Sequence, residues 1–170
     1  PGLPALALGS SLAAKPTGGS PTVVLYRPGF RLNDCLPFLG ENTRTLLVCN
    51  EADVAQGEVI GHISVMAVSR RGISRWRLLR WYDNVGSDTP LIVSVVPTGM
   101  RRVDLDDGQP GLQIKFKVLE VNRQDHEKAL DTSGETFNLI FQRKGRRFFA
   151  TAKTQGHLER IGAVTRKVLE

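Results

Sequence analysis

The chain has 170 residues, of which 41% are hydrophobic and 24% charged, and its formal net charge is +6. This length supports one ordinary hydrophobic core rather than two, and no apolar run approaches the ~20 residues of a membrane-spanning helix, so we expect no transmembrane segment. The positive charge favours a polyanionic partner, such as nucleic acid, an anionic membrane or the acidic surface of an assembly. Solubility alone explains the same charge equally well.

Residues 1–22 are rich in Gly, Ser, Ala, Leu and Pro, with one Lys and no acidic residue. Such a composition cannot bury enough apolar surface to form a core of its own. Ordering the segment costs roughly 1–2 kcal/mol per residue in backbone entropy, so we expect an extended arm that lies on another surface within an assembly. A segment without acidic residues is also typical of what remains after an organellar presequence is removed.

Residues 23–56 are expected to form an extension that contains strands. The β-branched run at 22–26 and the apolar run at 43–49 are candidate strands. The apolar segment at 32–39 is interrupted by Pro37 and is too short to assign.

The chain has two cysteines, Cys35 and Cys49, and both lie among apolar neighbours in the sequence. Two cysteines do not make a disulfide framework. Because free cysteine is among the most buried residue types, we expect reduced, buried thiols and therefore a reducing compartment.

From Gly57 onward the hydrophobic pattern becomes regular and predicts seven strands. The clearest is the run 112–121, in which apolar residues such as Ile114 and Phe116 alternate with polar ones such as Lys115. The predicted strands span residues 59–68, 75–82, 91–96, 101–105, 112–121, 137–141 and 147–152. The last two flank the basic loop 142–146 and are expected to form an antiparallel hairpin.

The period changes after this hairpin. Leu158, Ile161, Val164 and Val168 recur at spacings of three and four residues, which predicts an amphipathic helix. Such a helix buries one stripe, and the nearest surface for that stripe is the sheet. The predicted fold class is therefore mainly β with one C-terminal α-helix.

Two segments suggest a family. In residues 75–82, Arg75-Trp76-Arg77 leads into an aromatic pair, and in residues 147–169 a strand is followed by Thr154, a candidate helix cap, and the amphipathic helix. This order resembles a pleckstrin-homology (PH) domain over residues 57–170. The resemblance implies a seven-stranded bent sheet or partly open barrel capped by the helix. Ile161 stands where the family carries a helix tryptophan, and Leu78-Leu79 stand where lipid-binding members usually carry a basic residue.

The resemblance also implies an anion-binding surface. In phosphoinositide-binding members, basic residues of the first loop and the second strand hold the phosphates, and the matching residues here are Arg71, Arg75 and Arg77, with Arg70 adjacent. The arginine fork donates paired hydrogen bonds to phosphate. Alternation places Arg75 and Arg77 on one side of the strand and Trp76 on the other. A solvated basic face is the simpler alternative, and we favour contact with protein or nucleic acid over contact with an inositol lipid.

A second basic cluster lies at the tip of the predicted hairpin and consists of Arg143, Lys144, Arg146 and Arg147. Phe148 and Phe149 follow it directly. The cluster suits an RNA contact in which the tip holds phosphates and a base stacks on an exposed ring. Because both rings lie on a predicted core strand, we expect at least one of them to pack in the core.

The sequence gives little support for catalysis. None of the three histidines, His62, His126 and His157, lies beside a Cys, Ser or carboxylate at a spacing that suggests a proton relay. The cysteines and histidines match no zinc spacing, and no glycine motif for phosphate binding is present. We predict a protein that is not an enzyme and uses no cofactor or metal.

We therefore expect a non-catalytic structural or adaptor subunit of a larger, organellar assembly that binds protein partners through the N-terminal arm and the basic loops. We expect an intracellular location, in a mitochondrion or another organelle. Two alternatives remain open: recognition of phosphoinositides or an anionic membrane, and RNA binding within a ribonucleoprotein.

Overall fold

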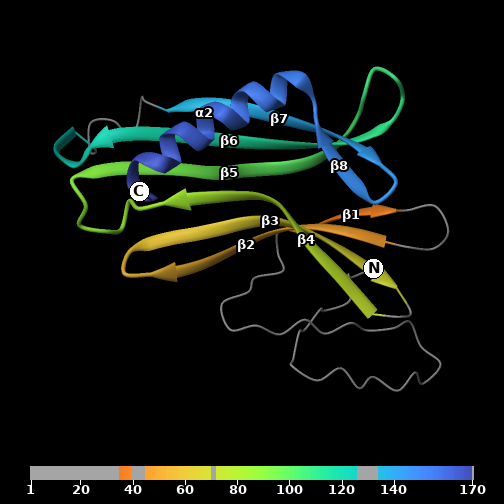
Figure 1. The fold of residues 1–170 in the computed structure, drawn as a ribbon, viewed down its shortest axis with the longest axis horizontal. Helices are drawn as coiled ribbons and strands as arrows, with labels where there is room; N and C mark the ends of the chain where they lie inside the picture. Colours follow the sequence, from red (N-terminus) through yellow and green to blue (C-terminus); the bar gives the residue numbers. More distant parts are fainter. Residues whose placement is uncertain (1–34, 40–44, 70–71, 126–133, 170) are drawn as a thin grey trace.

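The computed structural model describes residues 35–39, 45–69, 72–125 and 134–169. Within these residues, eight strands form one antiparallel sheet whose spatial order is the chain order, and one α-helix follows the last strand (Figure 1). The elements are β1 (Cys35–Leu39), β2 (Thr45–Ala55), β3 (Glu58–Ser69), β4 (Gly72–Asp83), β5 (Leu91–Asp104), β6 (Pro110–Asn122), the 3₁₀ turn η3 (Arg123–Asp125), β7 (Glu135–Lys144), β8 (Arg147–Ala150) and α2 (Ala152–Leu169).

The prediction of a mainly β fold that ends in a helix is confirmed, but the predicted number of seven strands is wrong. The predicted strands 91–96 and 101–105 are parts of one strand, β5, because Pro97 does not end it. Proline has no amide hydrogen for the ladder, and the β5–β6 register shifts between Pro97 and Gly99, so an irregularity absorbs the missing donor. Six strands therefore follow Gly57, and β1 and β2 add two to the same sheet.

Two of the expected segments fall on residues that the structure does not describe: the arm at 1–22 and the strand at 22–26. Of the expected extension at 23–56, β1 and β2 are described, and both pair within the sheet. The segment 32–39, which the sequence pattern left unassigned, contains β1.

The hairpin between β2 and β3 turns through Gln56 and Gly57. Both residues have positive φ, 52° and 78°, which is the conformation that a two-residue type I′ turn requires. A Cβ on Gly57 would lie 2.1 Å from the carbonyl oxygen of Gly86. The turn therefore packs against the loop that joins β4 to β5, and Gly57 is needed for its conformation and for this close approach.

The core surrounds the end of β4 on both of its faces. Trp81 and Tyr82 are consecutive and alternate across the strand, yet both are buried in the same hydrophobic cluster. The Trp81 ring lies over Gly61 of β3, and its Nε1 donates to Oδ1 of Asn50 at 2.8 Å. Tyr82 pairs with Ile60 of β3 and with Val95 of β5. Since β4 and β5 pair over two residues of each strand, the sheet bends at this point and both halves contribute to one core.

The C-terminal helix begins one residue after its cap. Thr151 Oγ1 accepts a hydrogen bond from the backbone N–H of Thr154 at 3.3 Å, which is the geometry of an N-cap residue. The prediction that Thr154 caps the helix is therefore wrong by three positions. Thr154 is buried, and its hydroxyl joins α2 to β7 by accepting from the N–H of Ile140 at 2.7 Å and donating to the carbonyl of Ile140 at 2.9 Å.

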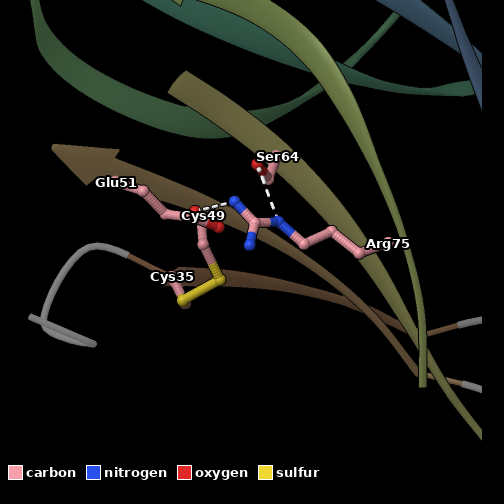
Figure 2. Close-up of a disulfide and its surroundings, with 5 residues drawn as sticks. All are labelled: Cys35, Cys49, Glu51, Ser64 and Arg75. Carbon is pink, nitrogen blue, oxygen red and sulfur yellow. Dashed lines mark hydrogen bonds and ion pairs between the residues drawn. A yellow bond between two sulfur atoms is a disulfide. The ribbon is translucent and has the colours of Figure 1, made fainter. Parts of the chain in front are cut away.

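The expectation of reduced thiols is also wrong, because Cys35 and Cys49 form a disulfide (Figure 2). The two residues are 14 positions apart in the sequence but directly opposite each other in the β1–β2 register, with their Cα atoms 4.1 Å apart. This bond ties the edge strand to its neighbour. Disulfides persist in oxidising environments, so the argument for a reducing compartment no longer holds.

Candidate functional site: two basic surfaces

The first basic surface lies on β4. Arg75 and Arg77 are directly opposite Met66 and Ser64 of β3, and directly opposed residues of antiparallel strands share a face of the sheet. Trp76 projects from the other face and packs against the core. The predicted alternation of these three residues is confirmed. Arg70 and Arg71 lie outside the described residues.

Arg75 is already engaged within the protein. Its guanidinium forms an ion pair with the buried carboxylate of Glu51 on β2, and its Nε donates to Oγ of Ser64 at 3.4 Å. Figure 2 shows the arginine side chain reaching across the sheet toward Glu51, beside the disulfide. A buried carboxylate needs such a partner, so the first task of Arg75 is structural.

Arg80 joins this surface although the sequence pattern did not single it out. Strict alternation from Arg77 would place Leu79 on the arginine side, but the β3–β4 register shifts between Ile63 and Ser64, and Arg80 then lies opposite His62. The irregularity changes which side chains share a face. We call this surface, made of His62, Arg75, Arg77 and Arg80, the arginine face.

The charges of the arginine face act on one titrating group, the imidazole of His62. The pKa of His62 is lowered from its usual 6.5, first by burial and then by the charges of Arg77, Arg80 and Arg75, while Asp53 acts in the opposite direction. Nδ1 of His62 is buried without a hydrogen-bond partner in the described structure. Arg77 and Arg80 are exposed and form no ion pair with any described carboxylate. The β2–β3 register also places the carboxylates of Glu51 and Asp53 on this face, and Glu51 pairs with Arg75, so Arg77 and Arg80 are the groups that favour an external anion.

The second basic surface lies at the β7–β8 hairpin. Gly145 has φ of 60° at the first position of the two-residue turn, as a type II′ turn requires. Lys144 and Arg147 flank the turn directly opposite each other and share a face with Phe149. Phe149 is 46% exposed, and Nζ of Lys144 lies 5.9 Å from the centre of its ring.

The remaining members of this predicted cluster are distributed differently. Arg143 lies opposite Phe148 on the other face, and its Nε donates to the carbonyl of Gly145 at 2.9 Å. Arg146 is exposed in the turn. Phe148 is buried, which confirms that at least one of the two phenylalanines packs in the core. The structure therefore brings Lys144, Arg147 and Phe149 together and separates Arg143 from them.

The two basic surfaces are separate, since β5 and β6 lie between β4 and β7 in the sheet. The described residues contain no group of three or more His, Cys, Asp or Glu side chains that is arranged to hold a metal ion. Of the helices in the described part of the chain, none is both long and apolar enough to cross a membrane.

Comparison with protein-family models, curated proteins and solved structures gave no match to this chain.

Proposed function

We propose that this chain is a non-catalytic binding subunit of a larger protein assembly, and that the arginine face docks on an acidic segment of a partner protein. The observation that carries the proposal is the pair Arg77 and Arg80. Both are exposed, both lack a described counter-ion, and both flank a histidine whose pKa they lower. A carboxylate of the partner would supply the missing negative charge and accept paired hydrogen bonds from either guanidinium.

The same face is a weaker candidate for an inositol lipid. Of the three arginines that the PH resemblance implies, Arg75 is committed to Glu51 and Arg71 lies outside the described residues. The likeness to a PH domain remains our proposal; the antiparallel meander, the bend at β4 and the closing helix support it, whereas the eight strands depart from it.

We further propose that residues 1–22 contribute to assembly and that the protein works in an organellar compartment. The disulfide favours a compartment that is oxidising.

The proposal is tested by affinity purification of the tagged protein from its native cells after nuclease treatment, followed by mass spectrometry. Arg77→Ala with Arg80→Ala should lose the co-purifying proteins. Lys153→Ala with Arg166→Ala removes the same charge from exposed positions of α2 and should retain them. Deletion of residues 1–22 should abolish assembly and leave the domain folded, as judged by circular dichroism.

Three results would contradict the proposal. The first is recovery of the wild-type protein without any co-purifying protein. The second is loss of the same partners from both double variants. The third is that Arg77→Ala with Arg80→Ala abolishes binding to phosphoinositide vesicles and leaves the protein complex intact. The last result would assign the arginine face to a membrane.

A further inference from the structure

The half of the sheet formed by β5 to β8 has one face that the helix does not cover. Ile161 and Val164 of α2 share the core with Leu139 and Ile114, so the helix lies on the face from which those two residues project (Figure 1). The residues that alternate with them form the opposite face. We call this opposite face the basic sheet face, and the positions that matter are Arg101, Lys115, Lys117, Lys144, Arg147 and Phe149.

The strand register places these positions on a common face. Arg101 lies opposite Gln113 on the neighbouring strand, two positions before Lys115. Lys115 and Lys117 lie opposite Asn138 and Thr136. The row continues along β7 to Gln142 and Lys144, which lie opposite Phe149 and Arg147 of β8. Five cations from four adjacent strands therefore project from one side of the sheet.

The charge of this face is unbalanced. Among the described strand positions of β5 to β8, no carboxylate shares it, and the other side chains there include Gln113, Thr136, Asn138 and Gln142. Asp107 in the β5–β6 turn contacts this face, where its Oδ2 accepts from Nε2 of Gln142 at 2.9 Å. Lys144 and Arg147 are like charges placed directly opposite each other, an arrangement that destabilises a sheet unless an anion lies between them.

Phe149 is an exposed aromatic side chain on a face that otherwise carries cations and polar groups. Among the described residues, Phe149 and Val54 are the large hydrophobic side chains that are exposed, and Phe149 is the aromatic one. Its neighbour Phe148, on the other face of the same strand, is buried and packs against Phe38. An exposed ring beside lysine and arginine is the arrangement on which proteins stack an unpaired base while cations hold the phosphates.

We propose that the basic sheet face binds a single-stranded nucleic acid, with a base stacked on Phe149 and the phosphates held by Lys144, Arg147 and the cations of β5 and β6. From Lys115 to Phe149 the path runs about 14 Å along the strands and about 10 Å across them, which is enough for several nucleotides. Single strands are favoured over a duplex because Phe149 needs an unstacked base. A membrane is disfavoured because Phe149 lies within β8 and not in the turn that forms the hairpin tip.

This proposal uses a different surface from the arginine face and does not depend on the proposed function. It is tested with the full chain by measuring the fluorescence anisotropy of a labelled oligouridylate of about 16 nucleotides over a range of salt concentrations. Lys144→Ala with Arg147→Ala should reduce the slope of log K against log salt by about 1.4, the loss expected for two phosphate contacts on a single strand.

Phe149→Ala should weaken binding about 5- to 150-fold and leave the salt slope unchanged, whereas Phe149→Tyr should restore the affinity because it keeps the ring. Because Phe149 is exposed, these variants should fold normally. Lys153→Ala with Arg166→Ala is the matched control: it removes the same charge from exposed positions of α2, which lies on the other side of the sheet, and should change neither affinity nor slope. A parallel measurement with a labelled oligothymidylate of the same length compares single-stranded DNA with RNA. Equal affinity indicates a site that accepts either sugar, and tighter binding of RNA indicates contact with the 2′-hydroxyl.

The proposal is overturned if Phe149→Ala binds as tightly as the wild type, or if the control variant Lys153→Ala with Arg166→Ala flattens the slope as much as Lys144→Ala with Arg147→Ala. Either result would mean that the oligonucleotide responds to overall charge. Binding to phosphatidylserine vesicles with no binding to either oligonucleotide would likewise overturn it and would assign the face to a membrane.

Discussion

Phe38 of β1 and Phe148 of β8 meet edge to face, with ring centres 5.2 Å apart and an angle of 77° between the ring planes. These residues belong to the first and last described strands of the sheet, which do not pair with each other through their backbones. The guanidinium of Arg102 on β5 lies 5.3 Å from the centre of the Phe38 ring. Side chains, and not a hydrogen-bonded ladder, therefore hold the two edges of the bent sheet near each other.

Replacement of Phe148 should therefore be costly and replacement of its neighbour should not. Phe148→Ala removes a buried ring and its aromatic partner contact, and we expect it to lower the free energy of unfolding by about 3–5 kcal/mol. Phe149→Ala, at an exposed position of the same strand, should change it by less than about 0.5 kcal/mol. Urea denaturation of the two variants makes the comparison. Equal losses would show that the Phe38–Phe148 contact does not hold the edges.

The disulfide should stabilise the fold measurably. Closing a loop of this size in the unfolded chain is worth about 3 kcal/mol in the chain-entropy model, and the cysteines are 14 residues apart. We expect dithiothreitol to lower the free energy of unfolding of the wild type by about this amount. Cys35→Ser with Cys49→Ser should start at the lower value and should not respond to the reductant. A wild type that is equally stable in both conditions would show that the bond does not constrain the unfolded chain.

The hydrophobic pattern predicted β6 by its alternation, α2 by apolar residues at spacings of three and four, and β3 by an apolar run that is buried continuously from Ile63 to Ala67. It missed β1 because Pro37 interrupts the run. Pro37 is tolerated there because β1 is an edge strand, where one row of backbone groups is not needed for the ladder. Pro97 had the opposite effect on the prediction: it suggested that a strand ends there, whereas β5 continues and its register with β6 shifts.

The candidate sites depend even more on information that spacing does not contain. Arg80 reaches the arginine face because of the register shift in the β3–β4 pair, and Cys35 meets Cys49 because β1 and β2 pair in one particular register. Lys115 and Lys117 were visible as the polar half of a strand, but their proximity to Phe149 requires the order of β6, β7 and β8. Local periodicity reports which face a residue occupies, whereas a site requires the neighbours of that face across other strands.

The ion pair between Arg75 and Glu51 should distinguish two arginines that look equivalent in the sequence. Arg75→Ala would leave the carboxylate of Glu51 buried without its arginine, and we expect a loss of about 1–3 kcal/mol. This is less than the ~3–5 kcal/mol of a fully buried pair, since the Arg75 side chain is 37% exposed. Arg77→Ala should cost less than about 0.5 kcal/mol.

The double variant Glu51→Gln with Arg75→Ala tests the reason for this loss. Removing the buried charge together with its partner should recover part of the stability that Arg75→Ala alone loses, as measured by urea denaturation in a double-mutant cycle. If the two effects simply add, the cost of Arg75→Ala comes from lost packing of its aliphatic stem and not from the carboxylate.

His62 should make the protein less stable in mild acid. Its pKa is below 6.5 in the folded state and close to 6.5 in the unfolded chain, so between these values the unfolded chain binds a proton that the folded state resists. The free energy of unfolding should therefore fall as the pH drops from about 7 through the folded pKa, and His62 should contribute no pH dependence above that range. His62→Gln, which cannot titrate, should flatten this part of the curve.

The causes of the shift can be separated by an NMR titration of the His62 imidazole, with His62→Gln used to assign its signal. Arg77→Ala with Arg80→Ala removes two of the charges that lower the pKa, so the pKa should rise toward 6.5. It should not reach that value, because burial, the largest cause, remains. An unchanged pKa in this variant would mean that the two guanidinium groups do not act on the imidazole, and the arginine face would then lack the positive potential on which its proposed role depends.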